Sequence, residues 1–205
     1  MNELEDDNYE LEDDLPSMIA LSSEDNKIRI TGIYGDIDEE RARDTLISLL
    51  SLYHTNKESE ENEEEPISRP IEFLISTGGG SISDMFAIYD TIRYVREEVE
   101  IHTRGIGRVM SAGILLLASG TKGHRKIGKY CRLMFHNVIG GQHGPLHEIK
   151  NSYDEAVYQQ DLLLKALSEE TNMSVEHLDK LVSKNIDVYF SAEEAVELGI
   201  ADIIV

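Results

Sequence analysis

The strongest constraint on the fold is an apolar strand that runs into a glycine-rich turn and then into an amphipathic helix. Residues 71–75 read Ile-Glu-Phe-Leu-Ile, which is typical of a strand, and the turn Thr77-Gly-Gly-Gly80 follows at once. Residues 82–96 then place apolar side chains at helical spacing, and another short strand and turn are predicted at 101–107. Strands that alternate with helices predict an α/β fold with a largely parallel sheet.

The rest of the chain continues this alternation. With 205 residues and no internal repeat, the chain is long enough for one domain with a single core. Further strands are predicted at 27–33, 132–136 and 201–205, and further helices at 38 to about 53, at 109–119, at about 146–170, near 174–183 and near 191–198.

Negative charge is concentrated in two segments. The net charge is −21; residues 1–14 carry eight acidic residues and no basic one, and residues 57–65 carry six glutamates and one lysine. Such runs repel themselves and lack apolar anchors. We therefore expect a disordered acidic tail at residues 1–15 and one folded domain at 16–205, into which 57–65 is inserted as an acidic loop. A basic patch with interleaved aromatic residues is missing from the sequence, which argues against nucleic-acid binding.

Several features of the sequence favour a cytoplasmic protein that does not bind membranes. The longest apolar stretch near the middle, residues 114–118, is too short to span a bilayer. The N-terminal segment is acidic and lacks the basic flank and apolar run of a secretory signal or a mitochondrial presequence. The single cysteine, Cys131, cannot form an internal disulfide, and its type fits a small buried side chain better than a catalytic thiol.

Two segments could stabilise negative charge on a substrate. Ser111 lies near the start of a predicted apolar helix, where unpaired backbone N–H groups suit a nucleophile that creates an oxyanion. A helix-capping role explains the same position. The glycine turn at 77–80 lets the backbone approach a ligand closely, although a tight structural turn is the alternative. Neither a phosphate-binding loop nor a dinucleotide fingerprint fits these glycines.

The third segment supplies a base. His136 ends an apolar strand, a position where a histidine often serves only as a structural hydrogen-bonding group. A serine needs an adjacent base to become a good nucleophile, and an imidazole that titrates near neutrality can serve. A carboxylate must then hold the imidazole in the required tautomer. From the residues alone, Asp154, Asp179 and Asp187 all remain open for that role.

Taken together, these segments resemble the proteolytic subunit of the Clp protease family. The resemblance covers residues 70–205 well and 27–69 loosely. It rests on four segments in the family's order, with 25 positions between Ser111 and His136. The matching segments are 76–83 with 88–91, 107–113 with 118–125, 132–136 with 140–141, and 187–195 with 199–202.

The resemblance implies a serine endopeptidase that degrades unfolded polypeptides or peptides through an acyl-enzyme. Ser111 would be the nucleophile, His136 the general base and Asp187 the group that orients the histidine, with Asp179 as the fallback. The backbone N–H groups of Gly80 and Ala112 would form the oxyanion hole. No metal or cofactor is expected at the site, and ATP would act only through a partner unfoldase.

The resemblance also implies a spiral of strand–turn–helix units, as in Clp proteases and crotonases. The helix at 146–170 would be a protruding handle that joins two stacked rings, heptameric in the family, around a chamber fed by an AAA+ unfoldase. The sequence departs from the family in its acidic tail, in Gly78 where the family has proline, in Asn137 where it has glutamine, and in the insertion at 57–65. These changes leave unfoldase docking and ring size open.

Two other functions compete with the active peptidase. One is a non-catalytic structural subunit of a Clp-type ring, which the altered N-terminus and the substitutions near the site favour. The other is a crotonase-type acyl-coenzyme-A enzyme, which shares the spiral fold but does not need the Ser111, His136 and Asp187 set.

Overall fold

A computed structural model describes residues 29–62 and 69–205 and shows a mixed α/β fold. The elements follow in the order β1 (Ile30–Tyr34), α1 (Glu39–Asn62), β2 (Ile71–Thr77), α2 (Ile82–Arg96), β3 (Ile101–Met110), α3 (Gly113–Ala118), β4 (Lys126–Ile127), β5 (Arg132–Phe135), α4 (Leu146–Glu170), α5 (Val175–Val182), β6 (Val188–Phe190), α6 (Ala192–Glu197) and β7 (Ile203–Ile204).

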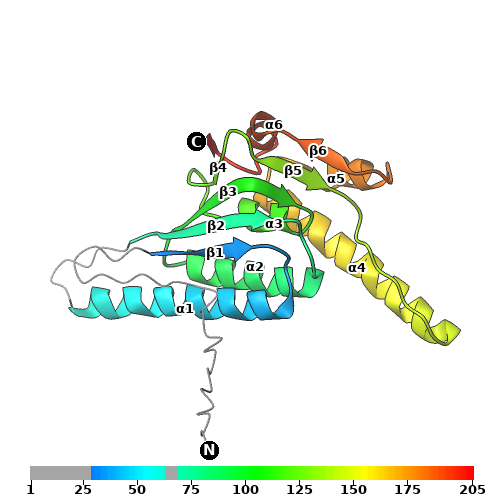
Figure 1. Ribbon diagram of the computed structural model, residues 1–205, viewed down its shortest axis with the longest axis horizontal. Coiled ribbons are helices and arrows are strands. Elements are labelled where there is room, and N and C mark those ends of the chain that lie inside the picture. The colour runs from blue at the N-terminus through cyan, green and yellow to red at the C-terminus, as the bar shows by residue number, and fades with distance from the viewer. Residues whose placement is uncertain (1–28, 63–68) are drawn as a thin grey trace, which may run out of the picture.

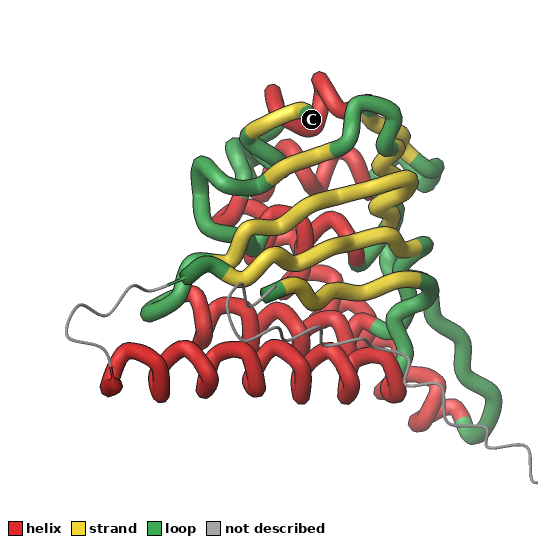
Figure 2. The backbone as a smooth tube through the Cα atoms, turned by 60° about the vertical axis from the view of Figure 1, so that its left-hand side comes forward, coloured by secondary structure: helices red, strands yellow, loops and turns green. Residues whose placement is uncertain are grey.

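The strands form one sheet in which β1, β2, β3, β4 and β7 are neighbours in that order, while β5 pairs with β3 and β6. Every described pairing is parallel except that of β5 with β6, which is antiparallel. Figure 2 shows the strands as successive rungs with the helices gathered beside them. The predicted α/β fold with a largely parallel sheet is confirmed.

The core lies on the helix-covered face of the sheet. In β2 the side chains alternate strictly, with Ile71, Phe73, Ile75 and Thr77 buried and the residues between them partly exposed. Such alternation places every second side chain on the same face. The helix α2 covers this face with residues such as Met85, Ile88 and Ile92, and all of α3 is buried. Among residues 29–62 and 69–205, no helix covers the opposite face of the sheet, which carries exposed and partly exposed side chains.

Two arginine–carboxylate pairs join α4 and the C-terminal segment to the rest of the fold; we call Tyr89, Arg96, Arg125, Glu170 and Asp202 the buried ion-pair cluster. The Arg96 guanidinium contacts both carboxylate oxygens of Glu170, at 3.0 and 2.9 Å, and the Tyr89 hydroxyl donates to Glu170 Oε1 at 3.2 Å. Arg125 donates to both oxygens of Asp202, at 2.9 and 2.6 Å, and to the Glu170 carbonyl at 2.7 Å.

This environment shifts two pKa values. Burial, followed by the negative charge of Glu170, raises the pKa of Tyr89 to about 12. Burial raises the pKa of Asp202, but the hydrogen bonds and the charge of Arg125 outweigh it and leave that pKa below its usual range. In both cases the pKa shift arises from burial of the group and from its charged hydrogen-bonding neighbour, Glu170 for Tyr89 and Arg125 for Asp202.

The structure differs from the sequence-based expectation in three ways. The helix α1 continues to Asn62, so residues 57–62 of the expected acidic loop are helical, since glutamate and lysine are good helix formers. Residues 109–110 belong to β3 rather than to a helix, because Val109 pairs with both β2 and β5, and α3 starts only at Gly113. The short strands β4 and β6 were not predicted.

The helix α4 spans the residues expected for the long helix, and its first half extends away from the sheet (Figure 1). Among residues 29–62 and 69–205, no helix combines the length and apolarity needed to cross a bilayer. The expected tail at residues 1–15 lies outside the described residues, so the division of the chain into a tail and a folded domain stays a prediction.

Candidate active site

Ser111 lies at the point where β3 ends and the chain turns into α3. Its backbone has φ 53, a left-handed conformation that non-glycine residues rarely adopt. The Ser111 N–H donates to the Met134 carbonyl of the neighbouring strand β5 at 2.7 Å. Strain of this kind persists only where surrounding contacts enforce it, and it is concentrated at functional sites.

His136 follows β5 directly and reaches back to that turn. Its Nε2 lies 2.8 Å from Ser111 Oγ, and both residues are partly exposed. The residue at the cap position of α3 is Ala112, with no side-chain cap bond, so the hydroxyl of Ser111 faces an imidazole rather than the helix. The structure therefore brings together the predicted nucleophile and the predicted base.

The glycine turn after β2 packs directly against the serine. A Cβ placed on Gly79, whose φ is +100, would lie 2.6 Å from the Cβ of Ser111, so any side chain there would displace it. A Cβ on Gly80, whose φ is +151, would lie 2.1 Å from the Ile37 carbonyl oxygen. The glycines at both positions are therefore required by close backbone approach, as well as by conformation.

The predicted oxyanion donors belong to this same turn and to the start of α3. Gly80 forms an isolated parallel bridge with Ile37. The two hydrogen bonds of this bridge run from the Ile37 N–H to the Gly79 carbonyl and from the Ser81 N–H to the Ile37 carbonyl. The bridge therefore leaves the Gly80 N–H uncommitted. The first hydrogen bond of the α3 turn runs from Ile114 N–H to the Ser111 carbonyl, so the N–H of Ala112 precedes the helical ladder.

The register of β5 and β6 determines where Asp187, the predicted third catalytic residue, lies relative to His136. Phe135 pairs with Val188 in this antiparallel ladder, and one further step places His136 opposite Asp187. Residues directly opposite in such a ladder have Cβ atoms about 5 Å apart. The Asp187 side chain is exposed, and within the described part of the chain no hydrogen bond or ion pair joins it to His136.

The other two aspartates lie on helices. Asp154 is on α4 and pairs with Lys150, and Asp179 is exposed on α5. Neither is hydrogen bonded to His136 in the described residues. Asp187 is thus the one of the three for which strand pairing supplies a route to the imidazole, and its role stays a prediction.

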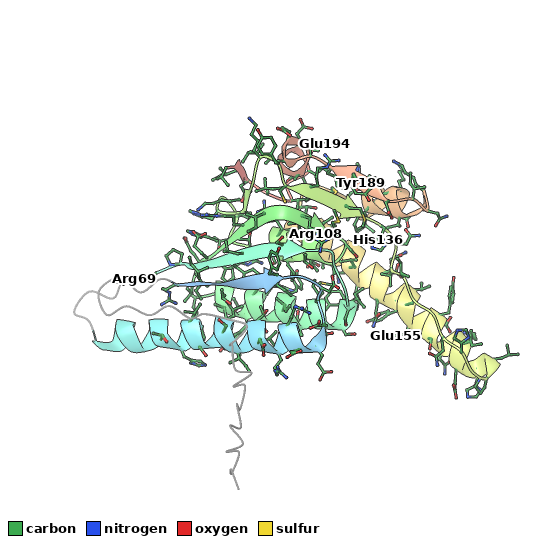
Figure 3. The ribbon with its side chains drawn as sticks, in the orientation of Figure 1. Arg69, Arg108, His136, Glu155, Tyr189 and Glu194 are labelled. Carbon is green, nitrogen blue, oxygen red and sulfur yellow. The ribbon has the colours of Figure 1, made fainter. Side chains whose placement is uncertain are left out.

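An open groove of about 850 Å³ runs from the serine and the histidine to α4. Figure 3 shows His136 where β5 ends and Glu155 along α4. The groove is rich in glycine and small polar side chains, which leave main-chain groups accessible. Its lining includes Gly78, Gly80, Ser111, Ala112, His136, Gly140, Gly141, Asn151, Ser152, Glu155 and Gln159.

A serine hydroxyl paired with an imidazole beside a tight glycine turn defines the site as that of a serine hydrolase. Comparison with known proteins narrows this class. The family model for Clp protease matches residues 17–205. The chain therefore belongs to the Clp protease family.

Curated relatives agree with this assignment. The ATP-dependent Clp protease proteolytic subunit 1 of Prochlorococcus marinus subsp. pastoris is 36% identical over 142 residues, which cover 69% of this chain and 70% of the relative. The protein of the same name from Gloeobacter violaceus is 33% identical over 177 residues, which cover 86% of this chain and 83% of the relative.

The family and these names indicate a serine-type peptidase, the proteolytic subunit of a Clp protease, as the sequence predicts. They do not favour the two alternatives, a non-catalytic ring subunit and a crotonase-type enzyme.

The contribution of α4 to the groove was missed by sequence reasoning. Asn151, Ser152, Glu155 and Gln159 lie on that helix and line the groove. In the sequence they form only the polar face of an amphipathic helix, a pattern that does not distinguish a solvated face from a binding surface.

Proposed function

We propose that this chain cleaves peptide bonds with Ser111 as nucleophile, His136 as general base and Asp187 as the residue that orients the histidine. The observation that carries the proposal is the 2.8 Å contact between Ser111 Oγ and His136 Nε2 at the head of the groove. The serine hydroxyl donates this hydrogen bond only if the imidazole proton is on Nδ1, where a carboxylate would hold it.

The chemical steps follow from this arrangement. Ser111 Oγ attacks the carbonyl carbon of the substrate while its proton moves to His136 Nε2. Negative charge then develops on the carbonyl oxygen, and the N–H groups of Gly80 and Ala112 are the proposed donors to it. The imidazolium returns its proton to the leaving amine, and a water molecule activated by the same histidine hydrolyses the acyl-enzyme. No step calls for a metal or cofactor.

The shape of the groove supports an extended polypeptide as substrate. The glycines in its walls, Gly78, Gly80, Gly140 and Gly141, expose backbone beside apolar side chains such as that of Phe135. Backbone groups can pair with the main chain of a substrate whatever its side chains, as in strand addition. Broad recognition of unfolded chains follows, in agreement with the proposed endopeptidase activity.

A fluorophosphonate probe tests the nucleophile directly. The native protein should acquire one probe adduct on the peptide that contains Ser111, and the Ser111→Ala variant should acquire none. Ser152→Ala is the matched control, because Ser152 lines the same groove from α4 and should leave labelling intact. Labelling that persists in Ser111→Ala, or that disappears in Ser152→Ala, would contradict the assignment.

We also propose that the chain works in stacked rings of identical subunits, with α4 as the handle of a spiral fold. Leu146, Ile149, Tyr153 and Val157 follow one another at helical spacing on α4 and are exposed, Leu146 to 85%. Parallel sheets are usually covered on both faces, yet in the described part of the chain one face is uncovered, with Ile30, Tyr34 and Ile106 exposed. Neighbouring subunits would cover both surfaces.

Native mass spectrometry tests this assembly. The native protein should give a mass that corresponds to seven or fourteen chains. Tyr153→Glu should break the rings apart at α4, while the solvent-facing Glu169→Ala should not. A native chain that stays monomeric at micromolar concentration would exclude the ring. An AAA+ unfoldase as partner and a cytoplasmic location complete the proposal. The unfoldase rests on the family resemblance, and the location rests on the single cysteine and on the acidic N-terminal segment.

A further inference from the structure

Outside the active-site groove, three side chains with metal-ligating atoms converge at the start of β3. Glu100 Oε2 lies 2.9 Å from His102 Nε2 and 3.9 Å from His124 Nε2. One potential ligand atom from each of the three residues lies within 4.8 Å of the others. The two imidazole rings are stacked, with centroids 4.2 Å apart and planes 2° from parallel.

The backbone that carries these side chains is held in place on both sides. The loop before His124 is joined to the start of β3, because Thr121 N–H donates to the Ile101 carbonyl at 2.8 Å and Ile101 N–H donates to Thr121 Oγ1 at 2.9 Å. Gly123 N–H donates to Asp202 Oδ2 at 2.8 Å. The ligand positions are therefore preorganised by the fold rather than by contacts among the ligands themselves.

A second carboxylate supports one of the histidines from outside the cluster. Glu72 Oε1 lies 3.5 Å from His102 Nδ1, the ring nitrogen that faces away from Glu100. Histidines that bind metals through one nitrogen usually donate the other N–H to a carboxylate, which fixes the tautomer. Glu72 is itself held on the open sheet face by Arg104 at 3.2 Å and Lys126 at 3.4 Å.

The cluster is also accessible to an incoming ion. The side chains of Glu100 and His124 are 55% and 44% exposed, while that of His102 is 12% exposed. The bond lengths of about 2.0–2.2 Å that are typical of zinc would require the two exposed side chains to rotate, and water would complete the coordination. Two imidazoles and one carboxylate are donors that suit divalent transition metals better than Mg²⁺ or Ca²⁺.

We propose that Glu100, His102 and His124 form a binding site for a divalent transition-metal ion of the Zn²⁺ type. The site lies at the end of β3 opposite Ser111, about 25–30 Å along the strand, so the ion would take no part in peptide hydrolysis. It would join the start of β3 to the loop before β4 and stabilise that corner of the sheet. No metal was expected from the sequence, because the three ligands are separated in the chain and match no metal-binding motif.

Titration with Co²⁺ tests the site, because bound Co²⁺ reports its ligands through visible absorption. The native full-length protein should bind one Co²⁺ per chain with imidazole-type absorption bands, Zn²⁺ should displace it, and Zn²⁺ should raise the melting temperature. Glu100→Gln and His124→Ala should each weaken binding at least tenfold, since each removes one ligand. Neither residue is buried, so both variants should fold, which circular dichroism checks.

Two control variants keep the result unambiguous. His177→Ala removes an exposed histidine of α5 that is remote in sequence from the cluster, and it should bind Co²⁺ as the native protein does. His136→Ala removes the active-site imidazole and should also retain the ion. Equal Co²⁺ binding by the native protein, Glu100→Gln and His124→Ala would overturn the proposal, as would loss of the ion in His136→Ala alone or no binding at millimolar Co²⁺.

Discussion

The active-site groove and the buried ion-pair cluster both contain polar side chains next to α3, yet they use them in opposite ways. In the cluster, Arg96 and Arg125 each donate to carboxylates and to backbone carbonyls, so the charges are saturated with partners. In the groove, Ser111 and His136 share one hydrogen bond and remain partly exposed. The difference shows that this fold separates polar groups that stabilise it from polar groups that keep capacity for a substrate.

The largest expected effect is on activity and comes from the groove. His136→Gln removes the base but keeps a polar side chain of similar size, so kcat for peptide hydrolysis should fall about 10⁶-fold. The unfolding free energy should change by less than about 1 kcal/mol, because a partly exposed side chain with one hydrogen bond is lost. Steady-state kinetics and urea unfolding of the same samples measure both quantities.

The pH dependence of the native enzyme belongs to the same test. His136 accepts the serine proton only in its unprotonated form, so kcat/KM should fall as the pH is lowered. A rate that is constant down to pH 4, or native activity in His136→Gln, would contradict a role for His136 as the base. The functional contrast between the groove and the buried ion-pair cluster would then be lost.

The largest expected effect on stability comes from the cluster. Asp202→Asn leaves the buried guanidinium of Arg125, a residue only 4% exposed, without its charged partner. The unfolding free energy should fall by about 3 kcal/mol, as for other broken buried pairs. Per folded molecule, kcat/KM should stay within about threefold of the native value, because the groove is not altered.

The pH dependence of stability tests whether the lost ion pair causes the destabilisation in Asp202→Asn. Since the folded-state pKa of Asp202 is lowered, its contribution is present above about pH 4, where an ordinary carboxyl group is ionised, and is lost as the pH falls through the folded value. The stability difference between the native protein and Asp202→Asn should therefore narrow in acid. A difference that is constant from pH 7 to pH 3 would show that the ion pair is not its source.

A smaller effect on activity should come from Asp187→Asn. If Asp187 holds the imidazole tautomer, the amide should lower kcat about 10⁴-fold with little change in KM, since substrate binding is not affected. Asp179→Asn, an exposed aspartate on α5, is the matched control and should be close to native. The reverse result, a loss in Asp179→Asn alone, would transfer the role to that residue.

The smallest effect should come from Tyr89→Phe. The change removes one hydrogen bond to Glu170, which Arg96 still holds, so the unfolding free energy should fall by about 1 kcal/mol at pH 7. Because the folded-state pKa of Tyr89 is raised to about 12, the native protein should lose stability between about pH 10 and 12, and Tyr89→Phe should lose less. Parallel denaturant curves at pH 8 and pH 11 compare the two.

Sequence patterns predicted the fold best where the spacing of apolar residues and the turn-forming residues indicate the same element boundaries. The segment from Ile71 to Arg96 was predicted closely, because a short apolar strand, three glycines and a helical stripe follow one another. The boundary at Ser111 was misplaced, since Val109 and Met110 are apolar in both a strand and a buried helix. Strands of two or three residues, such as β4 and β6, are too short to show a period.

For the candidate site, residue type and order were enough to select Ser111 and His136 once the family resemblance was considered. The choice among the aspartates could not be made from spacing, because it depends on the register of β5 with β6. The proposed metal site likewise depends on a loop that returns beside the start of β3, as the bonds between Thr121 and Ile101 show. Contacts of this kind are set by tertiary packing and leave no local pattern.

The late position of β6 in the chain has a consequence for the order in which the site is assembled. On the ribosome, the turn at Ser111 and the strand β5 emerge well before β6, with α4 and α5 synthesised in between. A nascent chain therefore contains its serine and its histidine while the partner strand of β5 is still missing. If Asp187 orients the imidazole, as proposed, full nucleophilic reactivity would wait until this later part of the chain has docked.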